Sequence, residues 1–137
     1  SIVFFAGCFH TTETTEEPTE KQEKTQEETK LTNYIDYSVE AMKAVDENSK
    51  VVLFFYANWC PTCRVAEKDL IQAHELLVKN DIVVVKLNFD KELTLRKKHD
   101  AKLQHTFVHI DENGKEVKKW NGGSSTTLFR MVMMEQI

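Results

Sequence analysis

The stretch Val51-Val-Leu-Phe-Phe-Tyr-Ala-Asn-Trp-Cys-Pro-Thr-Cys63 decides the fold. Its first six residues form a continuous apolar run rich in β-branched and aromatic side chains, which is typical of a strand buried on both faces of a sheet. Residues 64–79 follow with apolar side chains at the spacing of one long helix. The two cysteines are therefore predicted to lie where a central strand ends and a helix begins.

Helical and strand patterns flank this unit on both sides. Residues 34–45 have the pattern of a short amphipathic helix, and residues 82–89 that of a second buried strand. Asp90 is placed to cap a short charged helix over residues 91–99.

The end of the chain predicts a hairpin and a helix. Strands at 106–110 and 115–120 are joined across Asn113-Gly114, a strong hairpin signal because this pair supplies the positive φ values of a tight turn. Residues 124–134 then form a helix. Its predicted apolar side consists of Leu128, Met131 and Val132.

The order of these elements is helix, strand, helix, strand, helix, strand, strand, helix. It predicts an α/β fold in which a βαβ unit is followed by a helix, a hairpin and a terminal helix that covers the sheet. A right-handed crossover places the cysteines at the carboxyl end of the first strand, the edge at which open α/β sheets usually carry their ligand chemistry.

Composition limits the classes of protein to consider. A chain of 137 residues with 41% hydrophobic residues has room for one domain with an ordinary core. The net charge of -4 comes entirely from residues 11–30, which contain seven Glu and three Lys. Because the remainder is neutral and has no basic stripe, no nucleic-acid partner is expected. No run approaches the roughly 20 apolar residues that a membrane-spanning helix needs.

The N-terminal 30 residues predict an attachment to a membrane. The segment Phe5-Ala-Gly-Cys8 resembles the lipobox of bacterial lipoproteins, so residues 1–8 are interpreted as the remnant of a lipoprotein signal and Cys8 as the lipidation site. Residues 9–30 are predicted to be a disordered Thr/Glu-rich tether, because residues 11–30 contain no aliphatic or aromatic side chain to bury. The folded domain then covers residues 31–137. This predicts an extracytoplasmic, lipid-anchored protein of a bacterial cell membrane, with a cytoplasmic location as the alternative.

The pair Cys60 and Cys63 carries the predicted chemistry. A helix N-terminus favours a thiolate, so Cys60 is expected to be the nucleophile of thiol–disulfide exchange and Cys63 the thiol that resolves the mixed disulfide. Pro61 is tolerated in the first helical turn because its missing N–H would have no partner there. Trp59 is expected to form part of an apolar rim around an exposed Cys60 sulfur.

A pair of cysteines with this spacing can also be half of a zinc site. Such a site usually needs four ligands, and the sequence contains no second CxxC motif. His109 lies four residues after His105, but on a strand this is roughly 13 Å at about 3.3 Å per residue, so His109 is a poor fourth ligand. The position between a strand and a helix favours the redox interpretation.

Three blocks of the sequence resemble the thioredoxin superfamily. They are Phe55-Tyr-Ala-Asn-Trp-Cys-Pro-Thr-Cys63, Lys86-Leu-Asn-Phe-Asp90 and Thr106-Phe-Val-His-Ile-Asp-Glu-Asn-Gly-Lys115. The resemblance covers residues 51–123 and is nearest to extracytoplasmic thioredoxin-like proteins, including the C-terminal domain of DsbD. It implies a thioredoxin fold, with a central four- or five-stranded mixed sheet and helices on both faces. It also implies protein disulfides as substrates, a redox partner protein, and a lysine, here Lys86, beneath the active site.

Two positions depart from that family. Thioredoxins place an Asp six residues before the first cysteine as proton acceptor for the resolving thiol, whereas this chain has Phe54, so Glu67 or water is expected to deprotonate Cys63. The family has a cis-proline immediately before the Thr106 position, and this chain has His105. A trans peptide bond is expected there, because a cis bond before a residue other than proline costs about 2.5–4 kcal/mol.

His105 has three interpretations at this stage. Beside Cys60 it could stabilise the thiolate or carry protons, it could complete a Cys60, Cys63 and His105 cluster for zinc, copper or an iron–sulfur centre, or it could simply fill the place of the proline. The preferred prediction is a monomeric thiol–disulfide oxidoreductase without cofactor or bound metal, and the alternative is a metal-binding or iron–sulfur module. A redox-inactive adaptor is the third hypothesis. The predicted supporting residues are Trp59, Pro61, Thr62, Glu67, Lys86, His105 and Thr106.

Overall fold

A computed structural model describes residues 31–134, which form a five-stranded sheet with helices on both faces. The strands are β1 (Tyr34–Asp36), β2 (Lys50–Tyr56), β3 (Ile82–Asn88), β4 (Thr106–Ile110) and β5 (Glu116–Asn121). The helices are α1 (Val39–Ala44), α2 (Pro61–Gln72), α3 (His74–Lys79), α4 (Leu93–Lys98) and α5 (Ser125–Met133). The predictions for residues 1–8 and 9–30, including the lipidation of Cys8, lie outside the described residues.

The sheet is mixed, in the order β1-β3-β2-β4-β5. β1 and β2 run parallel to β3, while β4 is antiparallel to both β2 and β5. The apolar runs of β2 and β3 occupy the centre, where both faces of a strand are covered. Phe54, Phe55 and Phe107 are among the largest fully buried side chains. The predicted α/β thioredoxin fold is confirmed.

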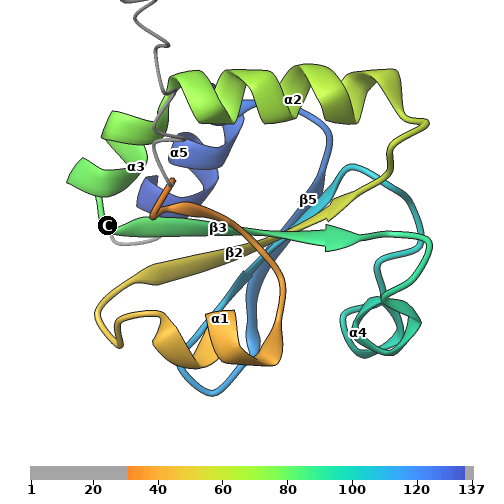
Figure 1. Cartoon of the computed structure of the whole chain (residues 1–137), viewed down its shortest axis with the longest axis horizontal. Helices are drawn as coiled ribbons and strands as arrows, with labels where there is room; N and C mark the ends of the chain where they lie inside the picture. Colours follow the sequence, from red (N-terminus) through yellow and green to blue (C-terminus); the bar gives the residue numbers. More distant parts are fainter. Residues whose placement is uncertain (1–30, 135–137) are drawn as a thin grey trace, which may run out of the picture. The chain divides into compact units, whose positions relative to one another are not determined.

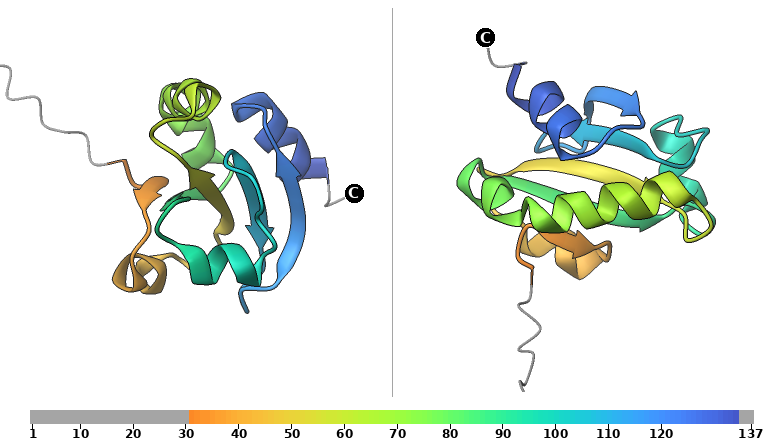
Figure 2. Two further views of the ribbon diagram at one scale, coloured as in Figure 1. Left: turned by 90° about the vertical axis from the view of Figure 1, so that its right-hand side faces the viewer. Right: turned by 90° about the horizontal axis from the view of Figure 1, so that it is seen from above.

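Helices form a layer on each face of the sheet. α2, α3 and α5 lie on one face, and α1 and α4 lie on the other (Figure 1). The views turned by 90° show the same division into three layers (Figure 2). No helix in the described part of the chain is long and apolar enough to cross a membrane.

The predicted helix over residues 34–45 is wrong in its first half. Tyr34–Asp36 is instead a short edge strand that pairs with β3, where the amide of Val84 donates to the carbonyl of Asn33 at 2.8 Å. The helix begins only after Ser38, whose hydroxyl accepts from the amide of Ala41 at 2.9 Å. Three residues are too few to show the alternation of a strand.

The predicted helix over residues 64–79 is two helices. It is interrupted at Ala73, which leaves the helical conformation with φ -89° and ψ 12° and also precedes the first residue of α3. Asp90, the predicted cap of the next helix, does not cap it: α4 starts after Glu92 and receives no side-chain cap.

The hairpin between β4 and β5 is confirmed, but its turn chemistry differs from the prediction. Gly114 has a positive φ of 77°, whereas Asn113 is absent from the described non-glycine residues with positive φ. The turn is held by Asp111, whose Oδ1 accepts from the amides of Asn113 and Lys115 at 2.9 and 2.8 Å.

Candidate active site

The fold places the two cysteines at the end of β2, as predicted. Cys60 is the N-cap of α2, and its Sγ accepts from the amide of Cys63 at 3.2 Å. Pro61 occupies the first turn, where no intrahelical acceptor is available for an N–H. The Cys60 sulfur therefore interacts with the unpaired amides that open the helix.

The pKa values of the two thiols move in opposite directions. Desolvation alone raises the pKa of Cys60, but hydrogen bonds from Cys63 and Thr62 outweigh it and lower this pKa below its usual value. Desolvation, followed by the hydrogen bond with Cys60, raises the pKa of Cys63 to about 12. Cys60 is thus the thiolate-forming member of the pair and Cys63 the member that stays protonated.

The predicted exposure of Cys60 is wrong. Its side chain is only 2% exposed and that of Cys63 is fully buried. Trp59 is 56% exposed, and its Nε1 donates to Oδ2 of Asp90 at 2.9 Å while its ring meets Phe89 edge-on. The indole is thus anchored to the loop after β3.

His105 lies against the cysteines on the loop before β4, as its alignment with the family's proline predicted. The peptide bond before it is trans, and the residue has a left-handed φ of 65°. Its amide donates to the carbonyl of Phe55 and its carbonyl accepts from the amide of Gly122, both at 2.8 Å. The ring is fixed at both nitrogens, with Nδ1 at 3.0 Å from Oγ1 of Thr62 and Nε2 at 2.7 Å from the carbonyl oxygen of Gly123.

Thr62 links the imidazole to the nucleophile. Its Oγ1 lies 3.2 Å from Sγ of Cys60, in addition to its contact with His105. Thr62 is itself exposed, whereas Cys60 is buried. The sequence indicated Thr62 only as part of the CxxC motif.

Aromatic rings fill the place where thioredoxins carry the buried acid. Phe54 is fully buried and stacks on Phe107 at a centroid distance of 4.4 Å, and Phe107 stacks on Trp120 at 5.5 Å. The His105 ring is 5.8 Å from that of Phe54. This environment supplies no carboxylate from β2.

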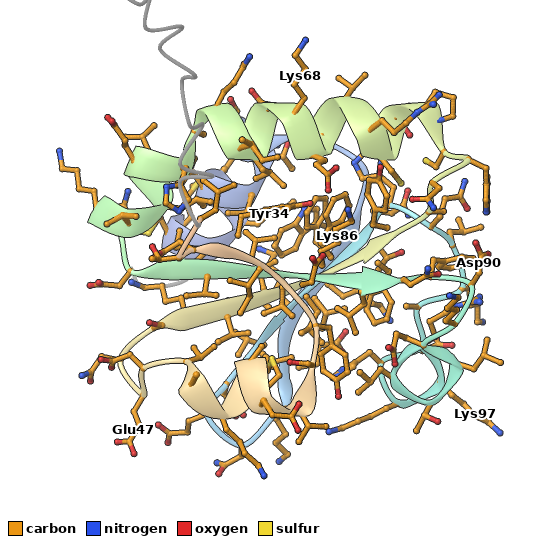
Figure 3. All side chains as sticks on the ribbon, viewed as in Figure 1. Tyr34, Glu47, Lys68, Lys86, Asp90 and Lys97 are labelled. Carbon is orange, nitrogen blue, oxygen red and sulfur yellow. The ribbon has the colours of Figure 1, made fainter. Side chains whose placement is uncertain are left out.

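Glu67 is engaged elsewhere. Its Oε2 accepts from the phenol of Tyr34 at 2.6 Å and from Nζ of Lys86 at 2.8 Å. Lys86 also lies over the ring of Tyr56, 4.1 Å from its centroid. Tyr34 and Lys86 lie between β3 and α2 in Figure 3. None of the hydrogen bonds described for residues 31–134 joins Glu67 to Cys63, so the proposed role of Glu67 as its proton acceptor gains no support from this geometry.

Thr106 is buried at the start of β4 and supports the loop that carries His105. Its hydroxyl donates to the carbonyl of Leu103 at 2.6 Å and accepts from Nδ2 of Asn121 at 3.1 Å. These contacts make Thr106 a structural neighbour of the site.

A groove of about 540 Å³ opens beside Thr62 and His105. Its lining is mainly apolar and includes Val65, Leu103 and Gly123. Val65 and Leu103 were missed by the sequence analysis, since exposed apolar side chains occur singly on most surfaces. The pair Gly122-Gly123 after a strand was the one signal that could have located this loop.

The Cys60, Cys63 and His105 side chains do come together. One potential ligand atom from each lies within 4.8 Å of the others. However, Oγ1 of Thr62 is at hydrogen-bonding distance from both Cys60 Sγ and His105 Nδ1. A metal ion bound to both atoms would have to displace this hydroxyl, so the described arrangement fits a hydrogen-bonded network better than a metal site.

Comparison with known proteins agrees with the thioredoxin fold. The sequence model of the AhpC/TSA family matches residues 22–131. Mitochondrial thioredoxin-3 of Saccharomyces cerevisiae is 30% identical over 103 residues, which are 73% of this chain and 73% of that protein. Thioredoxin-T of Drosophila melanogaster is 30% identical over 87 residues, covering 63% of this chain and 54% of the other.

Solved thioredoxin structures superpose on most of the chain. Schistosoma mansoni thioredoxin matches with a TM-score of 0.60 and 26% identity, over 76% of this chain and 96% of that one. The germline-specific thioredoxin Deadhead of Drosophila melanogaster matches with a TM-score of 0.61 and 26% identity, over 72% and 90% of the respective chains.

Proposed function

We propose that this chain, which belongs to the thioredoxin-like superfamily, exchanges disulfides with other proteins through Cys60 and Cys63. Oxidoreductase chemistry of this kind follows from its thioredoxin relatives and from the cysteine pair. The main observation behind this proposal is that Sγ of Cys60 accepts a hydrogen bond from the Cys63 amide at 3.2 Å, while the pKa of Cys60 is lowered and that of Cys63 is raised.

The reaction proceeds in two balanced steps. The Cys60 thiolate attacks one sulfur of a substrate disulfide, so that a mixed disulfide forms and the other substrate sulfur leaves as a thiolate that takes up a proton. Cys63 then loses its proton and attacks Sγ of Cys60, which releases the second substrate thiol and leaves Cys60 and Cys63 joined. Two electrons pass from the enzyme to the substrate, and the reverse sequence oxidises a dithiol.

The opposed pKa values order these two steps. A hydrogen bond with Cys60 and the charge on its sulfur are both among the causes that raise the pKa of Cys63. Once Cys60 is part of a mixed disulfide, its charge no longer opposes ionisation of Cys63. Cys63 therefore remains a protonated thiol until Cys60 has formed the mixed disulfide.

The test uses cysteine variants with a matched control. Cys60→Ser should abolish reduction of a disulfide-bonded protein, and Cys63→Ser should accumulate a mixed disulfide that mass spectrometry detects at Cys60. Cys8→Ser removes the third cysteine and should change neither result. Full activity in the Cys60→Ser, Cys63→Ser double variant would overturn the proposal.

The groove beside His105 is proposed to bind the substrate chain next to its disulfide. Its mainly apolar lining and its position at Thr62 support an extended polypeptide as occupant, with a second redox protein restoring the pair. We propose that the protein acts as a monomer. Sedimentation of the reduced protein should give the 15.9 kDa species, and a stable dimer would refute this part.

Attachment to a membrane outside the bacterial cytoplasm is a separate proposal. It is supported by the lipobox-like segment ending at Cys8 and by the Thr/Glu-rich composition of residues 11–30. Expression of the protein with a complete lipoprotein signal in bacteria should yield an acylated Cys8 peptide by mass spectrometry, and Cys8→Ser should yield none. An unmodified Cys8 would refute the anchor while leaving the exchange chemistry untouched.

The competing function is a metal-binding or iron–sulfur module that uses Cys60, Cys63 and His105. Its supporting observation is the approach of the three potential ligand atoms to within 4.8 Å. Protein purified without chelators should contain no stoichiometric metal if exchange is the function. Metal present in a 1:1 ratio and lost in His105→Pro would favour the module.

A further inference from the structure

Four polar groups form one continuous series from the nucleophile to the rear of the site. Sγ of Cys60 lies 3.2 Å from Oγ1 of Thr62, which lies 3.0 Å from Nδ1 of His105. Nε2 of the same ring lies 2.7 Å from the carbonyl oxygen of Gly123. Each separation is within hydrogen-bonding distance.

The last contact in the series fixes the tautomer of His105. A carbonyl oxygen can only accept, so Nε2 must carry a proton to bond with Gly123. In the neutral imidazole Nδ1 is then an acceptor, and it faces the hydroxyl of Thr62. The ring is thus held with its basic nitrogen directed toward the cysteine side.

The hydroxyl of Thr62 can form hydrogen bonds with Cys60 and His105 in two arrangements. With a neutral imidazole it donates to Nδ1 and accepts from the Cys60 thiol. With a protonated imidazole it accepts from Nδ1–H and donates to the Cys60 thiolate. A hydroxyl both donates and accepts, so no bond in the series is lost between the two states.

We propose that Thr62 relays a proton between the Cys60 thiol and Nδ1 of His105, with the Gly123 carbonyl holding the second proton on Nε2. This inference rests on the proposed exchange function and names the groups that ionise its nucleophile. The thiol proton passes to Oγ1 of Thr62 as the hydroxyl proton passes to Nδ1, which leaves a Cys60 thiolate and a His105 imidazolium. When a substrate disulfide is attacked, the imidazolium is the proton source for the substrate thiolate that leaves.

The backbone supports a dedicated role for His105. A left-handed φ of 65° is unfavourable for a residue with a Cβ, and such outliers concentrate at functional sites. The conformation is held by hydrogen bonds of its amide to Phe55 and of its carbonyl to Gly122. His105 thus supplies a base on the side of Cys60, a role distinct from the acceptor for the resolving thiol that thioredoxins carry at the Phe54 position.

Other ionisable groups on the neighbouring elements do not duplicate this role. After its N-cap Cys60, α2 carries Cys63 and four charged side chains, which are Arg64, Glu67, Lys68 and Asp69. Glu67 is paired with Lys86 of β3, Asp69 accepts from the amide of Ser125, and Arg64 and Lys68 are exposed. β2 contributes Tyr56, whose pKa is raised by burial first and then by Glu67. Residues 122–124, the segment between β5 and α5, contain no titratable side chain.

The test follows the rate of Cys60 alkylation by iodoacetamide between pH 5 and 10 in the reduced full chain. Thr62→Val removes the hydroxyl at nearly constant shape, and His105→Asn removes the base with a residue that tolerates left-handed φ. Thr62→Ser is the matched control because it keeps the hydroxyl. Thr62 is exposed, so its substitutions leave the core untouched.

The relay predicts a change in pH profile rather than a uniform loss. Thr62→Val and His105→Asn should both slow alkylation at pH 6–7, by about tenfold for each unit that the Cys60 pKa rises, and approach the parent rate near pH 10. Thr62→Ser should keep the parent profile.

Three outcomes would overturn the relay. They are an unchanged profile in Thr62→Val, a loss in His105→Asn that is equal at every pH, and a shift in Thr62→Val without one in His105→Asn. The last result would assign Thr62 a simple hydrogen bond to the thiolate. Reduction of a disulfide-bonded protein by the parent chain, measured in parallel, reports on the proposed function independently, since the alkylation profile requires no turnover.

Discussion

At the scale of single residues, the chemistry depends on how differently two adjacent thiols are treated. Cys60 caps the helix and accepts its amides, whereas Cys63 is fully buried behind it. Their pKa values consequently move apart, one below and one above the usual value of a thiol. A reagent that reacts with thiolates should therefore react differently with Cys60 and Cys63, although only two residues separate them.

Native reduced protein should incorporate one alkyl group into this pair at pH 7. The lowered pKa of Cys60 gives it a larger thiolate fraction at this pH than an ordinary thiol has, while Cys63, with a pKa of about 12, remains a thiol. Peptide mass spectrometry should find the label on Cys60, and unfolding in denaturant should make both sites reactive. Equal labelling in the native state would contradict the assignment of nucleophile and resolving thiol.

Glu67 is expected to matter for stability more than for resolution. It accepts hydrogen bonds from Tyr34 and Lys86, and a hydrogen bond to a charged group contributes about 1.5–3 kcal/mol, less where solvent screens it. Tyr34→Phe and Glu67→Gln should each lower the free energy of unfolding by about 1–2 kcal/mol, with less than additive loss in the double variant. Release of product from the mixed disulfide should stay within twofold of the parent rate in both. A selective tenfold slowing in Glu67→Gln would restore the carboxylate as proton acceptor for Cys63.

The two departures from the family could be predicted from sequence, but their consequences could not. Phe54 and His105 stand out because a motif assigns another residue type to each position. The contacts of Thr62 with His105 and of His105 with Gly123 join residues 43 and 18 positions apart. A backbone carbonyl leaves no mark in the sequence, so the residue that fixes the tautomer could only be found from the fold.

At the scale of elements, length decided what the sequence could predict. β2 and β3 are seven residues each and were predicted from their apolar runs. β1 has three residues, and its pairing with β3 is a tertiary interaction that no local pattern announces. Likewise, no Gly or Pro marks the interruption at Ala73. Ala is a strong helix former, so the sequence predicts that the helix continues there.

The turn after β5 provides a matched pair of glycine substitutions. Gly122 and Gly123 have φ values of 82° and 83°, so alanine at either position should cost about 1–2 kcal/mol in backbone strain. A Cβ at Gly122 meets nothing within 4 Å, whereas one at Gly123 meets Cβ of Thr127 at 2.6 Å. Gly123→Ala should therefore lower the denaturation midpoint further and displace the carbonyl that binds His105. Equal effects of the two substitutions would show that α5 adjusts freely.

Docking of α5 on α2 depends on one carboxylate. Oδ2 of Asp69 accepts from the amide of Ser125 at 2.7 Å, and hydrogen bonds from the side chain and amide of Ser125 lower the pKa of Asp69. Asp69→Ala should destabilise the protein by about 1–2 kcal/mol at pH 7, and the exposed Lys68→Ala on the same helix should have little effect.

The effect of Asp69 should depend on pH with a definite sign. Because its pKa is lower in the folded state, its contribution is present above the unfolded-state value of about 3.9 and is lost as pH falls through the folded-state value. Denaturation curves should therefore converge for parent and Asp69→Ala as pH is lowered from 7 to 2. A difference that persists undiminished at pH 2 would assign the loss to packing.

At the scale of the whole molecule, the described hydrophobic core and the net charge come from different parts of the chain. The described core is built from side chains at Tyr34 and beyond, and residues 31–137 carry no net charge. Residues 11–30 hold the whole net charge and no aliphatic or aromatic side chain. Such a segment can contribute little to folding, because it has almost no apolar surface to bury.

A fragment of residues 31–137 should accordingly fold and react as the full chain does. If residues 1–30 contribute nothing to the core, its free energy of unfolding should match that of the full chain within about 0.5 kcal/mol, and its rate of disulfide reduction should be unchanged. A fragment of residues 39–137 is the control, because it lacks β1 and the hydrogen bond from Tyr34 to Glu67 and should lose several kcal/mol. If the 31–137 fragment were as unstable as the control, residues before Leu31 would have to contribute to the core, and their interpretation as a tether would be wrong.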